Sequence, residues 1–245
     1  MADPSPYTSP LTYPGTPPEA SGLVLGAAYR ALRWSAVDAE LARRRVAGLA
    51  DRTPVVAIGS NAAPAQLRVK LAATEPAAAD PLVVPMAYVE LHGLAVGASA
   101  HVSRPGYVPA TPVSGDGERS RAFVVWLDAR QLAVVDRSEA SYDRVRLPSR
   151  FAVRHVAGRE PLAGCDIYVS RHGHLLDAYG RPRRLVAQPA LLRSLLEESE
   201  RLRILAGGCP ASWVMVMRDQ RARAQAGEIW RRENRVRTSD ESLTS

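Results

Sequence analysis

The feature that most constrains this chain is a short, β-rich apolar run over 55–58 that stops abruptly at Gly59-Ser60-Asn61. Glycine permits unusual dihedral angles and close approach to a ligand. Serine and asparagine favour local hydrogen bonds to the backbone over a continuing strand. Pro64 then opens a helix-compatible segment that reaches Leu71. Such a strand–turn–helix leaves backbone N–H groups unpaired at the positive helix end, so the stretch predicts either an ordinary turn or a small anion-binding cradle.

Strand patterns fill the middle of the chain, and helix patterns fill its ends. Runs rich in β-branched and apolar residues predict strands over 82–91, 94–102, 122–127, 144–147, 151–155 and 165–170. A leucine stripe predicts a helix over 185–205, ended by Gly207, and a second helix is expected over 213–230. This segregation is typical of an α+β fold rather than a doubly wound sheet.

The same patterns divide the chain into consecutive parts. We expect a Pro-rich tail (1–20), an N-terminal helical extension (21–53), a central domain (54–184), a C-terminal helical extension (185–236) and a polar tail (237–245). The Pro-rich tail is expected to be disordered or polyproline-like, with docking on the domain through Tyr7 and Tyr13 as the alternative. Within the central domain, a linker rich in proline and alanine is expected at 76–81. The leucines of the C-terminal extension predict a buried side that serves either as core or as the face of a homodimer.

The charge of the chain bears on its partners. Its 32 basic residues outnumber 25 acidic ones, for a net charge of +7, and all the basic residues except Lys70 are arginine. The arginines are scattered and no aromatic residues alternate with them, which does not favour nucleic-acid binding. No apolar run is long enough to span a membrane, and no secretory signal is apparent. Cys165 and Cys209 are isolated, so we expect a reduced, cytoplasmic protein.

A second pattern lies further along the chain. A strong strand over 122–127 is followed by Asp128, which suits the cap of a helix over 129–136. Glu139 comes just after that helix, with Tyr142 beyond it. Taken alone, Glu139 is typical of a surface glutamate near a helix end.

The two patterns together resemble the γ-glutamylcyclotransferase-like family, also called the AIG2-like family. The resemblance rests on the ordered set of Ile58-Gly59-Ser60-Asn61, Pro109-Ala110-Thr111 and the strand, helix, Glu139, Tyr142 and Arg144, and it covers roughly residues 54–170. It implies a compact α+β domain with a small, barrel-like mixed sheet around a pocket.

The resemblance also implies a reaction. The free α-amine of a γ-glutamyl group attacks its own side-chain carbonyl, which closes 5-oxoproline and releases an amine or amino acid. Glu139 matches the family's catalytic glutamate and would act first as base and then as acid. The substrate-binding residues implied are Ile58, Gly59, Ser60, Asn61, Thr111 and Tyr142. No metal or other cofactor is implied, and His172 and His174 alone fall short of a metal site.

Two positions depart from the family pattern. The usual tyrosine before Gly-Ser-Asn is Ile58 here, so any contact from its hydroxyl is missing. The usual glycine after the glutamate is Ala140, whose Cβ would alter the angle at which Glu139 enters the pocket. Either departure is compatible with a different γ-glutamyl substrate, or with the alternative function of a non-catalytic small-molecule-binding or regulatory protein on the same fold.

Overall fold

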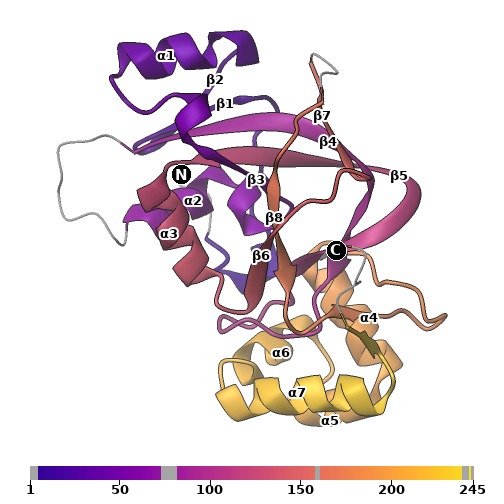
Figure 1. Ribbon diagram of the computed structural model, residues 1–245. Helices are drawn as coiled ribbons and strands as arrows, with labels where there is room; N and C mark the ends of the chain where they lie inside the picture. Colours follow the sequence, from indigo (N-terminus) through magenta and orange to yellow (C-terminus); the bar gives the residue numbers. More distant parts are fainter. Residues whose placement is uncertain (1–4, 73–81, 158–160, 239–242, 244–245) are drawn as a thin grey trace.

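The protein has an α+β architecture with one large mixed sheet and a two-stranded sheet (Figure 1). The computed structural model describes residues 5–72, 82–157, 161–238 and 243; the linker expected at 76–81 and the outer ends of both tails lie outside them. The large sheet contains β1 (Gly22–Leu25), β2 (Ala28–Ala31), β3 (Thr53–Ala57), β4 (Val83–Ala98), β5 (Ala110–Leu127), β6 (Tyr142–Arg146), β7 (Ala152–His155) and β8 (Asp166–Ser170). The predicted α+β class is therefore confirmed.

The order of the strands is an open path. It runs β2-β1-β4-β5-β3-β8-β6, with β7 pairing off this path to β4. The sheet is mixed, as expected for a barrel-like mixed sheet, but among the described residues no pairing joins the two ends of the path, so it is not a closed barrel. β3 lies inside this sheet, antiparallel to β5 and parallel to β8, which fixes where the turn after β3 emerges.

The two longest strands, β4 and β5, pair antiparallel. The sequence predicts a break near Gly93, but β4 continues through it. Gly93 adopts a positive φ of 80°, and the register with β5 shifts between His92 and Leu94. The glycine therefore makes a bulge in one bent strand, because its missing Cβ allows that dihedral angle.

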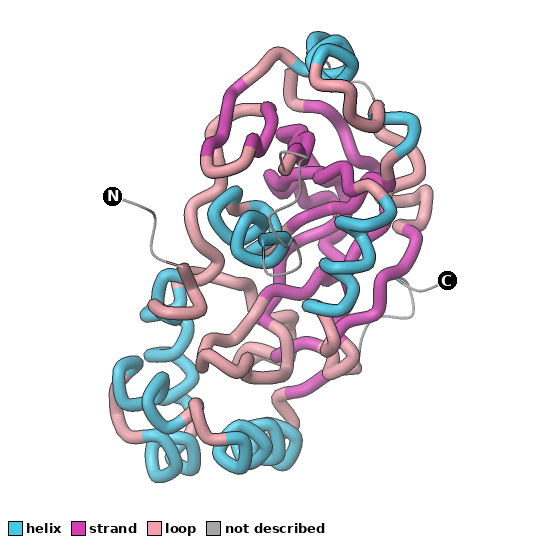
Figure 2. The backbone as a smooth tube through the Cα atoms, turned by 90° about the vertical axis from the view of Figure 1, so that its left-hand side faces the viewer, coloured by secondary structure: helices cyan, strands magenta, loops and turns pink. Residues whose placement is uncertain are grey.

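The described residues contain seven α-helices. They are α1 (Val37–Arg43), α2 (Pro64–Ala72), α3 (Ala129–Ser138), α4 (Gln188–Glu198), α5 (Glu200–Ala206), α6 (Pro210–Val216) and α7 (Gln220–Arg232). Helices α2 and α3 contact each other beside the sheet, whereas α4–α7 gather at one end of the molecule (Figures 1 and 2). None of the described helices has both the length and the apolar character needed to cross a membrane.

The C-terminal helices have their own hydrophobic core. The predicted leucine stripe is buried there, together with Trp213 and Trp230. The single helix expected over 185–205 is interrupted at Ser199, whose hydroxyl accepts from the Leu202 N–H and caps α5. Asp219 caps α7 in the same way and separates it from α6. The leucines thus pack within the chain, and a homodimer remains an untested prediction. A short sheet of β9 (His174–Leu175) and β10 (Val236–Arg237) adjoins these helices.

The segment over 21–53 is not the helical extension that the sequence predicts. Its first part forms β1 and β2, and β1 extends the large sheet by pairing with β4. Gly26, with a φ of 52°, makes the turn between them, and Leu23 and Val24 are buried. Only α1 confirms the helical expectation. The run contains Val24 and Tyr29 on either side of a turn glycine, which suits a hairpin of strands better than a helix.

The prediction that the proline-rich tail is disordered is also wrong over residues 5–20. It contains a 3-10 turn, η1 (Pro10–Thr12), and follows the domain surface to β1. Tyr13 is only 4% exposed and stacks on Tyr107, with ring centroids 4.2 Å apart. Composition underestimates such order because one aromatic anchor can bury enough surface to hold a proline-rich segment in place.

Candidate functional site

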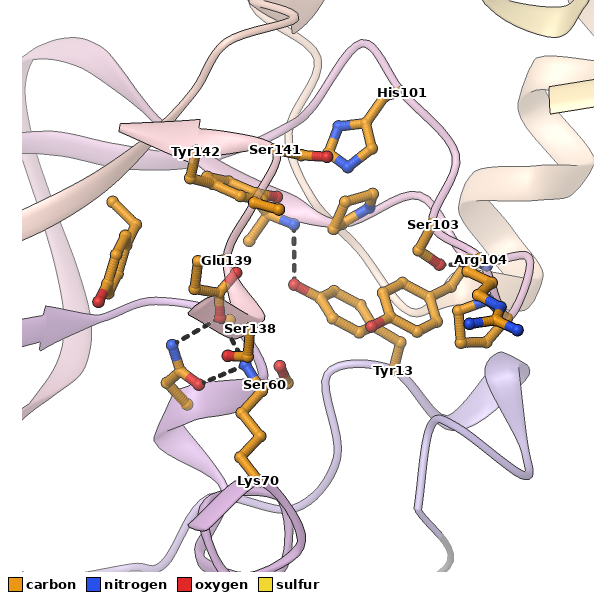
Figure 3. Close-up of a pocket in the computed structure, with 18 of the residues that line it drawn as sticks. Tyr13, Ser60, Lys70, His101, Ser103, Arg104, Ser138, Glu139, Ser141 and Tyr142 are labelled. Atoms are coloured by element: carbon orange, nitrogen blue, oxygen red, sulfur yellow. Dashed lines mark hydrogen bonds and ion pairs between the residues drawn. The ribbon is translucent and has the colours of Figure 1, made fainter. Parts of the chain in front are cut away.

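Four parts of the chain supply most of the lining of a cavity of about 570 Å³ (Figure 3). These are the turn after β3, the C-terminal end of α3, the loop before β5 and the N-terminal segment. Its size is within the range typical of small-molecule sites. The structure brings together most of the predicted site residues on its lining: Ile58, Gly59, Ser60, Asn61, Glu139 and Tyr142.

Thr111 is the predicted site residue that the structure places elsewhere. It is 1% exposed, and its Oγ1 accepts a hydrogen bond from the Ser170 N–H at 3.1 Å. Its neighbours Pro109 and Ala110 line the cavity in its place. Strand alternation explains the difference, because consecutive side chains point to opposite faces of a sheet. The prediction that Thr111 faces the pocket is therefore wrong.

Glu139 is held at the cavity by the geometry of α3. Asp128 begins that helix with a capping box, in which Asp128 and Gln131 exchange side-chain-to-backbone hydrogen bonds. Glu139 ends it, donating its N–H to the Val135 carbonyl at 3.0 Å. The Cβ of Ala140 does not turn Glu139 away, since both residues line the cavity.

The Glu139 carboxylate belongs to a buried polar cluster. Its Oε1 lies 2.5 Å from Lys70 Nζ and 3.0 Å from Asn61 Nδ2. Lys70 also donates to Asn61 Oδ1 at 2.8 Å. The Lys70 and Glu139 side chains are 6% and 15% exposed. Because both charged groups are poorly solvated, each needs the other as a hydrogen-bonded partner. With Asn61 bonded to both, the three side chains fix one another's positions.

Three tyrosines form an aromatic wall of the same cavity. Tyr13 and Tyr107 stack with their planes 15° apart. The Tyr13 Oη accepts from the Ala110 N–H at 2.8 Å, and the Tyr142 Oη donates to the Ala110 carbonyl at 2.9 Å. Burial raises the pKa of all three phenols above the usual range. The wall therefore consists of neutral phenol groups at physiological pH.

His101 adds a neutral imidazole to the lining. Burial, reinforced by His172, lowers the pKa of His101 from its usual 6.5 to about 3. Its Nδ1 lies 2.7 Å from Ser99 Oγ, and its ring is 4.6 Å from that of His172. No group of three or more His, Cys, Asp and Glu side chains in the described ranges lies close enough together to hold a metal ion.

The cavity lining carries more positive than negative charge. Lys70, Arg104 and Arg223 contribute cationic groups, whereas Glu139 is the one carboxylate among the described lining residues. Lys70 neutralises Glu139. Arg223 Nη1 donates to the carbonyls of Met217 and Arg218 at 2.8 Å each, but both arginines keep their positive charge at the lining. A lining of this kind attracts anionic small molecules.

For two of these functional candidates, Lys70 and Tyr13, the sequence does not indicate a place in the site, although Tyr13 is a candidate docking residue of the tail. Lys70 carries one signal, since it is the only lysine in an arginine-rich chain, but nothing local indicates its partner. Tyr13 lies in a proline-rich segment and meets Tyr107 only in the folded chain. Both depend on contacts between residues far apart in the sequence, for which a single sequence holds no periodic pattern.

Comparisons with known proteins give a weak structural likeness. No protein-family model matches the chain, and no match is found among curated proteins. A solution structure of a protein from Arabidopsis thaliana matches with a TM-score of 0.36 and 21% identity. That match covers 49% of this chain and 62% of the other, and a likeness of this strength does not identify a family.

Proposed function

We propose that the protein is a γ-glutamylcyclotransferase-type enzyme, which cyclises a small γ-glutamyl amine or peptide to 5-oxoproline and releases the amine. The observation that carries the proposal is the contact between the two distant segments of the family-like pattern. Asn61 of the turn lies 3.0 Å from Glu139 of α3, and both line one cavity. The cavity thereby places a carboxylate beside a turn with backbone donors.

Glu139 has the geometry that the proton transfers need. Both of its hydrogen-bond partners among the described residues bind Oε1, which leaves Oε2 to a ligand. Oε2 accepts a proton from the substrate α-ammonium, and the freed nitrogen attacks the side-chain carbonyl carbon. As that C–N bond forms, the carbonyl π electrons move to oxygen. The oxyanion then collapses, the bond to the leaving nitrogen breaks, and that nitrogen takes the proton from Glu139. The ring nitrogen gives its own second proton to the released amine, so the products are 5-oxoproline with one ring N–H and an ammonium ion.

Much of the rate in such a reaction comes from holding the substrate folded. A well-oriented intramolecular attack can supply about 7–11 kcal/mol of the barrier. Tyr13, Tyr107 and Tyr142 line the cavity together with the Lys70–Glu139–Asn61 cluster, and both sets restrict the space open to a substrate. The surplus positive charge of Arg104 and Arg223 suits the α-carboxylate that every γ-glutamyl substrate carries.

The experiment that tests the proposal is 5-oxoproline release from a panel of γ-glutamyl amines, amino acids and peptides. We expect wild-type protein to release 5-oxoproline from at least one member and Glu139→Gln to lose about 10²–10⁴-fold in kcat. Glu118→Gln is the matched control, because Glu118 lies in β5 and pairs with Arg184 away from the cavity. If wild type releases no 5-oxoproline from any compound of the panel, the proposed enzymatic activity is overturned. If Glu139→Gln keeps full activity, Glu139 is not the acid and base of the reaction.

One observation favours a second candidate, a binding protein without catalysis. Lys70 already neutralises Glu139, and such a pair also suits a purely structural carboxylate. In that case calorimetry would show that a γ-glutamyl compound binds to the wild type, with no 5-oxoproline released from it.

A further inference from the structure

The N-terminal segment delivers Tyr13 into the cavity, directly against the Gly59–Asn61 turn. The Ala110 N–H donates to its hydroxyl oxygen at 2.8 Å, and the Ser60 N–H gives the same oxygen a further backbone contact. A Cβ at position 59 would lie only 2.6 Å from the Tyr13 Oη. Glycine at the turn thus makes room for this hydroxyl, and the expected anion cradle is in part filled by Tyr13.

This arrangement leaves the hydroxyl with one unused hydrogen. A phenol has one hydrogen to donate, and its oxygen here accepts from the backbone. Among the described residues the Tyr13 hydroxyl accepts a hydrogen bond from Ala110 and donates none. Burial, together with Tyr107 and Glu139, raises the pKa of Tyr13 far above its usual range, so the hydrogen stays on the oxygen. A buried donor without an acceptor is costly, and a ligand oxygen in the cavity would satisfy it.

The backbone contacts also make the hydroxyl a stronger donor. Hydrogen bonds in a chain polarise one another, so an O–H whose oxygen accepts N–H groups donates more strongly. Stacking on Tyr107 fixes the ring and therefore the direction of the hydroxyl. Donors held in advance at the place where charge develops are the most effective kind of electrostatic catalysis.

We propose that the Tyr13 hydroxyl donates a hydrogen bond to the side-chain carbonyl oxygen of the γ-glutamyl substrate and stabilises the oxyanion that forms on it. This inference rests on the proposed function and adds a catalytic residue to it. Tyr13 donates a hydrogen bond throughout and gives up no proton. The proline-rich segment is then part of the active site, and a chain that lacks residues 1–20 has an incomplete pocket.

The test compares Tyr13→Phe with wild type in the 5-oxoproline release assay. Phenylalanine keeps the ring that stacks on Tyr107 and removes only the hydroxyl. We expect kcat to fall about 10²–10³-fold, as for the loss of one oxyanion donor, with KM within about threefold of wild type. The matched control is Tyr179→Phe, since Tyr179 is 82% exposed and lies outside the cavity lining, and it should keep full activity.

The possible outcomes separate this inference from the proposed function. If wild type is active and a folded Tyr13→Phe keeps its kcat within threefold, the role of Tyr13 is overturned and the proposed function stands. The same holds if the substitution raises KM and leaves kcat unchanged. If wild type releases no 5-oxoproline from any compound, both fall. Should Tyr13→Phe fail to fold, 3-fluorotyrosine at position 13 keeps the shape and changes the hydroxyl acidity. A kcat shift of at least about twofold would then support the role, and an unchanged kcat would contradict it.

Discussion

At the residue scale, the Lys70–Glu139 pair decides whether the cavity keeps its shape. Removing one partner leaves the other charge buried and uncompensated, which typically costs about 3–5 kcal/mol. We predict losses of this order in the free energy of unfolding for Lys70→Met and for Glu139→Gln, measured by urea denaturation. The double variant should lose clearly less than the sum.

The exposed pair of Arg171 and Asp143 provides the control for that cycle. Its side chains are 56% and 58% exposed, and such pairs contribute roughly 0–1 kcal/mol. Arg171→Met should therefore have little effect on unfolding. Strictly additive losses at Lys70 and Glu139 would show that the buried pair is not coupled.

His101 gives the site a predictable response to acid. Its folded-state pKa is lowered to about 3, whereas the unfolded chain titrates near 6.5. Between these values the unfolded state binds the proton first, so the stability contributed by neutral His101 is present above about pH 6.5 and is lost as the pH falls. We predict that His101→Gln loses less stability than wild type between pH 7 and pH 4, in thermal melts. A larger loss in the variant would contradict the buried, neutral state of His101.

At the scale of elements, α3 carries Glu139 to the cavity and depends on its first residue. Asp128 accepts from the Gln131 N–H at 2.9 Å and lies 3.7 Å from the buried guanidinium of Arg52. Replacing a capping residue by alanine typically costs about 0.5–2 kcal/mol. We predict a destabilisation near the top of this range for Asp128→Ala by urea denaturation, and less for Asp128→Asn, which keeps the cap. Equal stabilities for wild type and Asp128→Ala would contradict the assigned role.

At the scale of the whole molecule, local signals predict the parts of this fold that local chemistry determines. The strand that stops at Gly59, the cap at Asp128 and the leucine face of α4 each depend on neighbours in sequence, and each is found where expected. The positions of Glu139 and Asn61 on one cavity follow from a resemblance that joins two such local patterns.

The remainder depends on contacts across the chain. β1 is a strand because the edge of β4 is available to it, and Thr111 turns inward because of its place in the register of β5. Tyr13 is buried because Tyr107 and Ala110 receive it. None of these partners is near in sequence, so no periodicity or motif could indicate them.

The central claim is that one cavity binds the γ-glutamyl group between the turn and Glu139. The most direct measurement is a titration of ¹⁵N-labelled protein with 5-oxoproline, the product, followed by the shifts of backbone amide resonances. We predict that the largest shifts fall on Gly59, Ser60, Asn61 and Glu139, and that Tyr179 does not shift. Saturable shifts centred on another surface, or none at millimolar ligand, would contradict the claim.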